Sequence, residues 1–185
     1  TGGAVYGDSG MKMSKESDFC NPMNQYGKYK LKLENILEGI WKETEFDVDI
    51  LRISNPYGGH FFNYFTSGFI NTTLSKIKLN APLNIWGNGL QIRDFIHIND
   101  VCEYIRRSIE IRGFNLMNIG TGVGHSLVST CKLIAQVNTV KIDIHFDDDY
   151  LELVPYNVLH TTKSTEILGY TPRLDLKSGI RLEKL

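Results

Sequence analysis

Hydrophobic residues recur every three or four positions between residues 27 and 45, which predicts an amphipathic helix. We expect one buried stripe on this helix, formed by Leu33, Ile36, Leu37, Ile40 and Trp41. The next stretch, VDILRIS (48–54), is apolar and rich in β-branched residues, which predicts a strand. It leads into NPYGG (55–59), where proline and glycine predict an irregular loop.

The same alternation of helical and extended patterns continues along the chain. Further helices are expected over 61–77, 99–110 and 125–137, and strands over 83–87, 93–97, 114–120 and 141–146, with two short helices closing the chain. Such alternation predicts an α/β fold in which helices cover both faces of a parallel sheet, together with a smaller irregular lobe.

Composition narrows the class of protein without naming a function. The chain has 185 residues, of which 42% are hydrophobic, enough for the core of one domain or slightly more. Twenty basic and 21 acidic residues are scattered along it, so charge gives no reason to expect nucleic acid or a charged membrane surface as a partner. No apolar run approaches the roughly 20 residues that a membrane-spanning helix requires.

Cysteine and histidine spacing offers no metal site. Cys20, Cys102 and Cys131 lack the close spacing of metal or redox motifs, which fits reduced thiols in a cytoplasmic protein. His60, His97 and His160 are too far apart in sequence to form a ligand pair on one helix or hairpin.

One spacing points to catalysis. Tyr26 and Lys30 stand four residues apart at the start of the first predicted helix, so they share a helical face. An ammonium group there stabilises a neighbouring phenolate and lowers the pKa of the tyrosine, which makes Tyr26 a candidate general base. Such a pair is common by chance. Its position gives it weight, because it follows TGGAVYG (1–7) and precedes the strand that ends in NPYG.

Six segments share order and spacing with one known family: TGGAVYG, YGKYKLKLENIL, LRISNPYGG, LNIWGNGLQIRDFIHINDVCEYI, NIGTGVGHSL and KSTEILGYTP. Together they resemble the nucleotide-sugar epimerase and dehydratase family of extended short-chain dehydrogenases, and most of all its UDP-glucose 4-epimerase-like group. The resemblance implies a Rossmann-type parallel sheet that holds NAD and a smaller mixed α/β lobe that holds an NDP-sugar, most often a UDP-hexose.

The resemblance also implies a division of the chain. Residues 1–56 would be the C-terminal part of the NAD-binding Rossmann domain, and 57–185 mainly the sugar-nucleotide lobe, with 114–137 returning to the Rossmann sheet. TGGAVYG would end a central strand beside the nicotinamide. The family's glycine-rich GxxGxxG turn has no counterpart here, so we expect a C-terminal portion that lacks most of the cofactor-binding half.

Catalytic roles follow from the resemblance residue by residue. Tyr26 matches the family's base, and Lys30 matches the lysine that also holds the nicotinamide ribose. The family's third catalytic group is a hydroxyl at the position of Gly2, so the preceding Thr1 is the candidate for it here.

The same segment bears on the reaction. Dehydratases of the family carry an Asp-Glu pair after that hydroxyl, whereas this chain has Gly3 and Ala4. Epimerisation at carbon four through a 4-keto intermediate is therefore the leading expectation. A reductase of 4-keto sugars and an inert fragment that only binds or associates are the alternatives.

Substrate contacts are implied at three places. Asn55 matches the family's asparagine at the sugar diphosphate and cofactor, Arg93 its diphosphate arginine, and Ile85 with Trp86 its uracil contact. Without the resemblance, the commoner roles of such residues would be a strand-ending turn for Asn55, a surface charge for Arg93 and core packing for Trp86. Asp100 is expected to cap a helix.

Two further expectations concern charge and assembly. The family's second diphosphate arginine is missing, and HFDDDYLEL (145–153) brings acidic groups that oppose a diphosphate unless they face solvent: Asp147, Asp148, Asp149 and Glu152. The resemblance also implies a homodimer through the helix that begins near Tyr26. The stripe of Leu33, Leu37 and Ile40 has the alternative use of packing on its own sheet.

Overall fold

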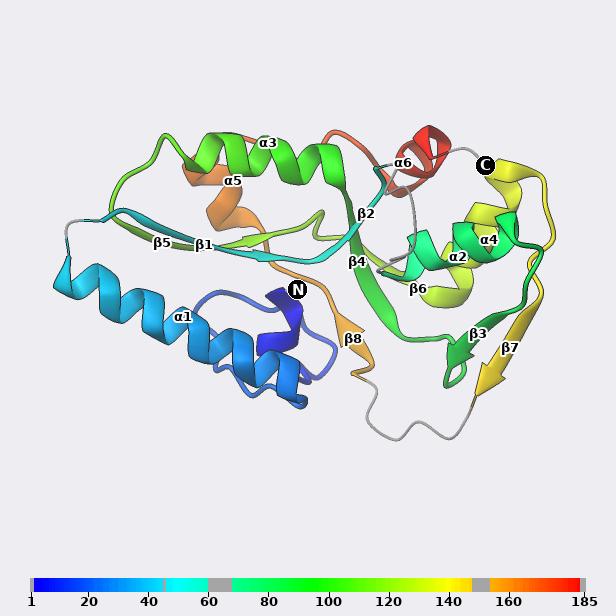
Figure 1. The fold of residues 1–185 in the computed structure, drawn as a ribbon, viewed down its shortest axis with the longest axis horizontal. Helices are drawn as coiled ribbons and strands as arrows, with labels where there is room; N and C mark the ends of the chain where they lie inside the picture. Colours follow the sequence, from blue (N-terminus) through cyan, green and yellow to red (C-terminus); the bar gives the residue numbers. More distant parts are fainter. Residues whose placement is uncertain (1, 45, 60–67, 148–153, 184–185) are drawn as a thin grey trace.

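The computed structural model describes residues 2–44, 46–59, 68–147 and 154–183. Short helices and strands alternate through these ranges (Figure 1). The elements are η1 (Gly2–Val5, a 3-10 helix), α1 (Gln25–Glu43), β1 (Val48–Ile53), β2 (Asn55–Tyr57), α2 (Phe69–Lys78), β3 (Leu83–Trp86), β4 (Ile92–His97), α3 (Ile98–Ser108), β5 (Phe114–Ile119), β6 (Gly124–Ser126), α4 (Leu127–Asn138), β7 (Ile144–Asp147), β8 (Tyr156–Asn157), α5 (Thr162–Leu168) and α6 (Leu176–Leu182).

A parallel pair of strands forms one end of the molecule. β1 and β5 run in register from Val48 opposite Phe114 to Ile53 opposite Ile119. They lie between α1 on one side and α3 with α5 on the other (Figure 1). A parallel pair covered by helices on both faces is the arrangement that the alternation predicts, so the Rossmann-type α/β fold class is confirmed.

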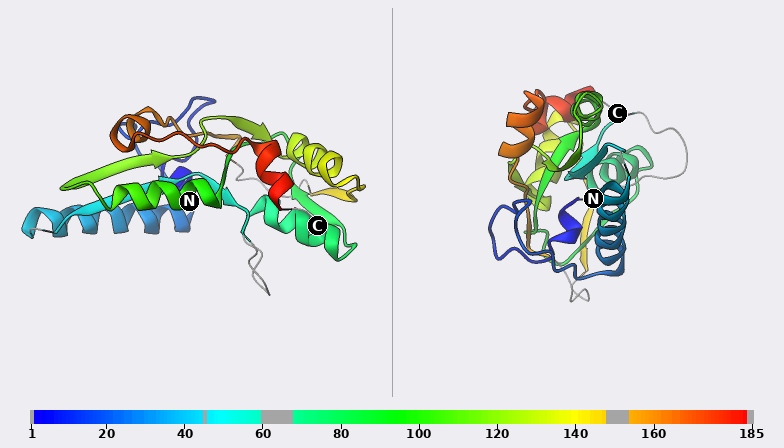
Figure 2. Two further views of the ribbon diagram at one scale, coloured as in Figure 1. Left: turned by 90° about the horizontal axis from the view of Figure 1, so that it is seen from above. Right: turned by 90° about the vertical axis from the view of Figure 1, so that its left-hand side faces the viewer.

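β4 connects this end with the rest of the molecule. It pairs in parallel with β2 and β8 and in antiparallel with β6. At the far end β3 pairs in parallel with β7. Figure 2 shows the resulting elongated shape, with β1 and β5 at one end and β3 and β7 at the other.

Two large apolar clusters hold the elements together. One packs α3 and α5 against the β1 and β5 strands, and its buried members are Ile96, Val101, Tyr104, Met117, Ile119, Leu168 and Tyr170. The other packs α2, α4 and α6 around β2 and β4, and its buried members are Tyr57, Ile70, Leu74, Phe95, Ile134, Leu176 and Ile180.

The structure corrects two predictions about local form and describes a third only in part. The first described residues form the 3-10 helix η1 and not the end of a strand. NPY (55–57) is the short strand β2, because its backbone pairs with β4. The predicted helix over 61–77 is described from Phe69 onward, and residues 60–67 lie outside the described part.

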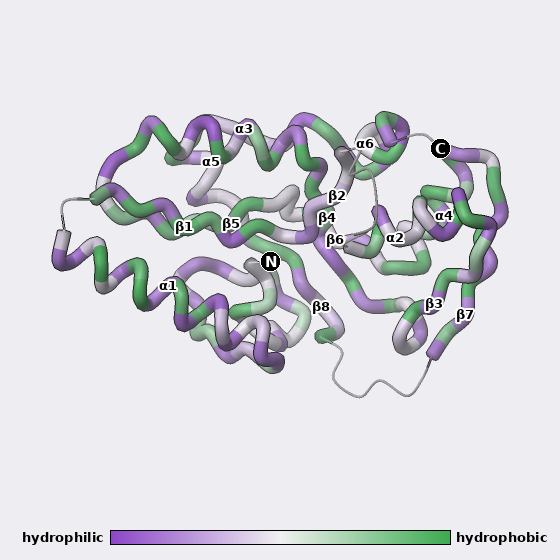
Figure 3. Tube along the Cα trace, viewed as in Figure 1, coloured by the Kyte–Doolittle hydropathy of each residue, from purple (hydrophilic) through white to green (hydrophobic). Residues whose placement is uncertain are grey.

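The expected buried stripe on α1 was wrong. Leu33, Ile36 and Ile40 are exposed, while Leu37 and Trp41 are half-buried. Figure 3 shows the apolar positions spaced along α1 among polar ones. Periodicity identified the helix correctly, but Leu33, Ile36 and Ile40 face outward along it.

No helix in the described ranges combines the length and the apolar character that crossing a membrane would need.

Asp100 has a different role from the predicted helix cap. His97 caps α3, because its Nδ1 accepts a hydrogen bond from the Asn99 N–H. Asp100 lies in the first turn and is buried. Its carboxylate accepts hydrogen bonds from the Tyr170 hydroxyl and from the backbone N–H groups of Arg173 and Leu174. It therefore ties the segment between α5 and α6 to α3.

Replacing Asp100 tests this role. Asp100→Ala leaves three buried donors without their acceptor, so we expect the free energy of unfolding to fall by roughly 2 to 4 kcal/mol in urea titrations. Glu110→Ala, in an exposed ion pair with Arg106, is the control and should change it by less than about 0.5 kcal/mol. Equal effects of the two variants would contradict the assignment.

Candidate active site

The predicted Tyr26 and Lys30 pair is present at the N-terminus of α1. Asn24 caps the helix by accepting a hydrogen bond from the Gly27 N–H at 2.8 Å. Tyr26 is 49% exposed, and the Lys30 Nζ lies 5.4 Å from the centroid of its ring. The phenol is thus accessible from outside with a cation beside it, as a general base requires.

Close packing at Gly27 brings this helix to η1. Gly27 is the buried residue of α1, and a Cβ there would overlap the Ala4 carbonyl oxygen. A side chain at this position would push α1 away from η1. The glycine therefore fixes the distance between Tyr26 and the segment that resembles the family's hydroxyl-bearing strand end.

η1 itself has no space for side chains at its first two positions. A Cβ on Gly2 would overlap the backbone of Arg52, and one on Gly3 would overlap the Asn157 carboxamide. Thr1 lies outside the described residues. The position that matches the catalytic hydroxyl is thus closed by β1, and the first of the two dehydratase acid positions is closed by β8.

Asn157 lies beside the candidate site, and the sequence did not single it out. It is half-buried, lies against Gly3 and is the register partner of Arg93 on β4. Within the described part of the chain, its side chain forms no hydrogen bond. Its place depends on the pairing of the two-residue strand β8 with β4, for which the sequence carries no local signal.

Arg93 is placed as an anion-binding residue would be. Its Nη1 donates to the Ile92 carbonyl at 2.8 Å, and burial lowers the pKa of its guanidinium. No carboxylate within the described ranges pairs with it, whereas the more deeply buried Arg52 pairs with Glu34. A half-buried cation without a partner favours an anionic ligand.

Asn55 supports the neighbouring strand. Its Nδ2 donates to the Asp94 carbonyl at 2.9 Å. The Asp94 side chain in turn accepts from the Thr121 N–H and hydroxyl and from the Gly122 N–H. Burial raises the pKa of Asp94, while these hydrogen bonds oppose the rise. Asn55 and Asp94 therefore fix the loop after β5 beside β2 and β4, and no donor among the described residues bonds to the Asn55 side-chain oxygen.

The two predicted uracil contacts, Ile85 and Trp86, differ in the burial of their side chains. Ile85 is buried in a cluster with Leu83 and Cys131, so its side chain belongs to the core. Trp86 is 55% exposed and pairs in register with Asp147 on β7. Of the two, only Trp86 offers a side chain to a ligand.

The acidic run is described only at its first residue. Asp147 ends β7 and is exposed, as expected for a carboxylate turned to solvent. Asp148, Asp149 and Glu152 lie outside the described residues.

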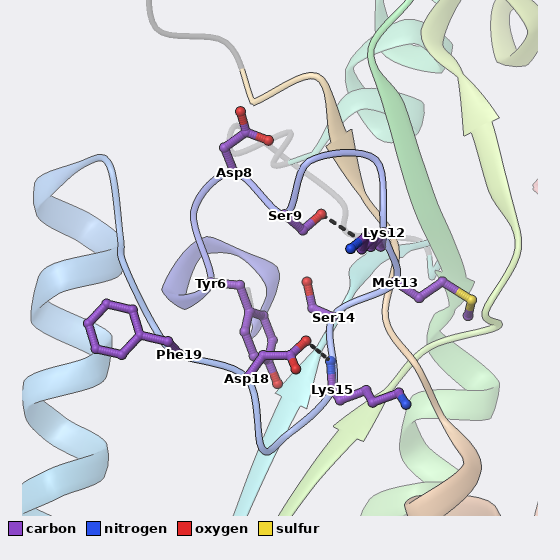
Figure 4. A pocket seen from close by; sticks show the side chains of 9 residues that line it. All are labelled: Tyr6, Asp8, Ser9, Lys12, Met13, Ser14, Lys15, Asp18 and Phe19. Atoms are coloured by element: carbon purple, nitrogen blue, oxygen red, sulfur yellow. Dashed lines mark hydrogen bonds between the residues drawn. The ribbon is translucent and has the colours of Figure 1, made fainter.

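A cavity of about 480 Å³ lies beside Tyr6 in the loop between η1 and α1. Figure 4 shows the Tyr6 hydroxyl pointing toward the strands, away from the opening. Asp8 and Asp18 accept hydrogen bonds from backbone N–H groups of the same loop. Tyr26 and Lys30 are not among the lining residues, which are Tyr6, Asp8, Ser9, Lys12, Met13, Ser14, Lys15, Asp18 and Phe19. The cavity is separate from the candidate site.

The described ranges contain no group of three or more His, Cys, Asp or Glu side chains that could hold a metal ion. His97 instead contacts Glu183, with its Nε2 3.1 Å from the carboxylate, and His60 lies outside the described residues.

Comparison with known proteins gives a consistent result. The model of the NAD dependent epimerase/dehydratase family matches residues 1–120. A dTDP-4-dehydro-6-deoxyglucose reductase of Escherichia coli is 33% identical over 97% of this chain and 57% of its own length. A dTDP-D-glucose 4,6-dehydratase of Homo sapiens is 31% identical over 96% of this chain and 52% of its own length.

The structural comparison agrees. A crystal structure of UDP-glucose 4-epimerase with UDP-glucose, from Thermotoga maritima, matches with a TM-score of 0.91 at 27% identity, covering 98% of this chain and 59% of that one. The chain therefore spans between half and three fifths of the length of the relatives it matches.

The closed geometry of η1 can be tested by stability. Gly2→Ala should lower the free energy of unfolding by about 2 kcal/mol, because its Cβ would meet the backbone of β1. Gly39→Ala, in α1 where a Cβ has open space, should raise it by roughly 0.5 to 1 kcal/mol. Thermal or urea unfolding measures both, and a neutral Gly2→Ala would refute the packing described for η1.

Proposed function

The chain belongs to the NAD-dependent epimerase/dehydratase family, and we propose that it is the part of a nucleotide-sugar 4-epimerase that carries the base and the substrate lobe. The substrate would be an NDP-hexose, with a UDP-hexose favoured, oxidised at carbon four and then reduced again. The observation that carries this proposal is the accessible Tyr26 phenol with the Lys30 ammonium beside it, next to a segment without an acid.

The residues have distinct tasks in this reaction. Tyr26 takes the proton from the hydroxyl on carbon four and returns it to the same oxygen after the second half-reaction. Lys30 stabilises the phenolate in between. NAD, when bound, supplies the hydride acceptor.

The residues present fit one end of NAD. Lys30 and Tyr26 share a face of α1 and would hold the nicotinamide ribose, and Asn55 on β2 would be a further cofactor contact. The 185 residues contain no counterpart of the family's glycine-rich pyrophosphate turn. In this proposal, residues 1–56 belong to the cofactor domain and 57–185 mainly to the sugar-nucleotide lobe.

The substrate lobe supplies charge and an aromatic surface. Arg93 would pair with the diphosphate, since its guanidinium is half-buried and has no carboxylate partner in the described ranges. The exposed Trp86 would contact the uracil ring of the nucleotide. The Thermotoga maritima relative contains UDP-glucose, which supports a UDP-sugar here.

The geometry of η1 favours epimerisation over dehydration. Elimination of water needs an acid and a base beside the sugar, and Gly3 and Ala4 provide neither. The Asn157 carboxamide occupies the space that a side chain at Gly3 would need. A 4-keto-sugar reductase is the second candidate, because the Escherichia coli relative carries that name and such a reaction needs no eliminating acid.

The test uses the natural gene product at its full length, NAD and UDP-glucose. We expect UDP-galactose to form, and Tyr26→Phe to lower kcat by roughly 10²- to 10⁴-fold, because the base is lost. Tyr29→Phe, on the exposed side of the same helix, is the matched control and should leave kcat unchanged.

Two outcomes would contradict this function. Turnover of a 4-keto sugar with NADH, without any epimerisation, would favour the reductase. Absence of turnover with either substrate would favour an inert association module.

We propose further that the enzyme is a cytoplasmic homodimer. α1 exposes Tyr29, Leu33, Ile36 and Ile40, whose spacing of four, three and four residues forms one apolar row. α1 lies at the outer edge of the molecule in Figure 1, so a second copy can reach this exposed row. The three separated cysteines fit a reducing compartment.

A charge in the apolar row tests the dimer. Ile36→Glu should shift the mass measured by analytical ultracentrifugation from dimer toward monomer, since an unpaired carboxylate would be buried at the interface. Leu79→Glu, at a more exposed apolar position after α2, should leave the mass unchanged. A wild-type monomer would refute the proposal.

A further inference from the structure

A buried ion pair joins α1 to the sheet, and the proposed reaction does not use it. Arg52 on β1 is 4% exposed, and Glu34 on α1 is 14% exposed. The Arg52 Nη2 lies 2.6 Å from Glu34 Oε2, and its Nε lies 3.1 and 3.2 Å from the two carboxylate oxygens. This is a fork-shaped contact with both oxygens of the carboxylate.

The other side of the guanidinium is held equally firmly. The Arg52 Nη1 donates to the Tyr6 hydroxyl at 2.8 Å, and the guanidinium carbon lies 4.8 Å from the centroid of the Tyr6 ring. The Tyr6 hydroxyl donates in turn to the Asn118 Oδ1 at 2.7 Å. The Arg52 side chain is thus held directly by Glu34 of α1 and by Tyr6, and through Tyr6 it is linked to Asn118 of β5.

Glu34 also occupies a special position relative to the base. It follows Lys30 by four residues, as Lys30 follows Tyr26, so the three side chains form one row along α1. On an isolated helix, a glutamate four residues after a lysine is within reach of its ammonium group. In this structure, Glu34 turns to Arg52, and the Lys30 Nζ lies beside the Tyr26 ring.

We propose that Arg52 is a positioning residue that withholds the Glu34 carboxylate from Lys30 and so leaves the lysine charge for Tyr26. Arg52 acts through Glu34 and touches neither substrate nor cofactor. The use of that charge in catalysis rests on the proposed function, whereas the competition between Arg52 and Lys30 for Glu34 does not.

Glu34 is the carboxylate for which Arg52 and Lys30 compete, and the other ionisable groups around it have separate roles. Burial raises the pKa of Tyr6 to about 12, so it is neutral near pH 7. Cys20 of the loop before α1 interacts with both Arg52 and Glu34, and burial raises its pKa as well. Asp18 of that loop accepts a hydrogen bond from the Lys15 N–H. Burial acts to lower the pKa of Arg52, but its hydrogen bonds with Glu34 and Tyr6 raise it overall, so it stays charged.

The experiment follows the titration of Lys30 directly by NMR of isotope-labelled lysine side chains, with the signal assigned through Lys30→Arg. In Arg52→Met, the freed Glu34 should pair with Lys30. We expect the Lys30 signal to titrate about 0.3 pH unit or more above its wild-type midpoint. An unchanged midpoint in a folded Arg52→Met variant would overturn the proposal.

Three further variants separate this effect from general disruption. Arg52→Met combined with Glu34→Gln removes both charges and should return the midpoint to the wild-type value. Arg112→Met, which breaks the exposed pair with Asp47, should not move it. Glu34→Gln alone leaves the Arg52 charge unpaired and should lower the midpoint. A midpoint below the wild-type value in the double variant would show that Glu34 already pairs with Lys30, which refutes the proposal even if Arg52→Met does not fold.

Kinetics in the natural gene product connects the titration to catalysis. The acid-side midpoint of the kcat pH profile reports the loss of the proton from the base Tyr26. In Arg52→Met, Glu34 neutralises the Lys30 charge, so we expect this midpoint to shift upward, as the Lys30 midpoint does. KM for the sugar nucleotide should stay within about twofold. An inactive wild type would refute the proposed function and leave the NMR result valid. If the wild type is active but its Lys30 midpoint is the same in Arg52→Met, this inference alone is refuted.

Discussion

The ion pair between Glu34 and Arg52 is the contact on which the arrangement of the candidate site depends. α1 buries Gly27 and leaves much of its apolar surface outside, so packing alone gives it little hold on the sheet. The buried pair joins the middle of the helix to β1, and Gly27 brings its N-terminus against Ala4. Breaking a buried pair on one side leaves an unpaired charge, which destabilises by roughly 3 to 5 kcal/mol. The position of Tyr26 therefore depends on polar contacts more than on an apolar core.

Local patterns predicted the elements of the fold well and their environment less well. Periodicity located α1, β1 and β5 to within about two residues, because helices and strands follow from spacing along the chain. Burial depends on what a neighbouring element covers, which periodicity does not contain. The row on α1 was therefore expected inside and is exposed, and NPY became the strand β2 through pairing with β4.

Some residues of the candidate site could likewise be predicted from the sequence, and others could not. The Tyr26 and Lys30 pair follows from a four-residue spacing on one helix and could be predicted from the sequence. Arg93 needed the family resemblance, and the structure adds that it is half-buried and lacks a carboxylate partner in the described ranges. Asn157 and the Arg52 contacts arise from pairing between segments far apart in sequence, so no local motif indicates them.

The fate of the hydrogen on carbon four tests the central claim most directly. We would give the natural gene product UDP-glucose deuterated at carbon four, with NAD, and follow the label by NMR and mass spectrometry. An epimerase returns the same hydride to carbon four, so the UDP-galactose formed should keep the deuterium there. Deuterium at carbon six in a 4-keto product would show elimination of water and contradict the account based on Tyr26, Gly3 and Ala4.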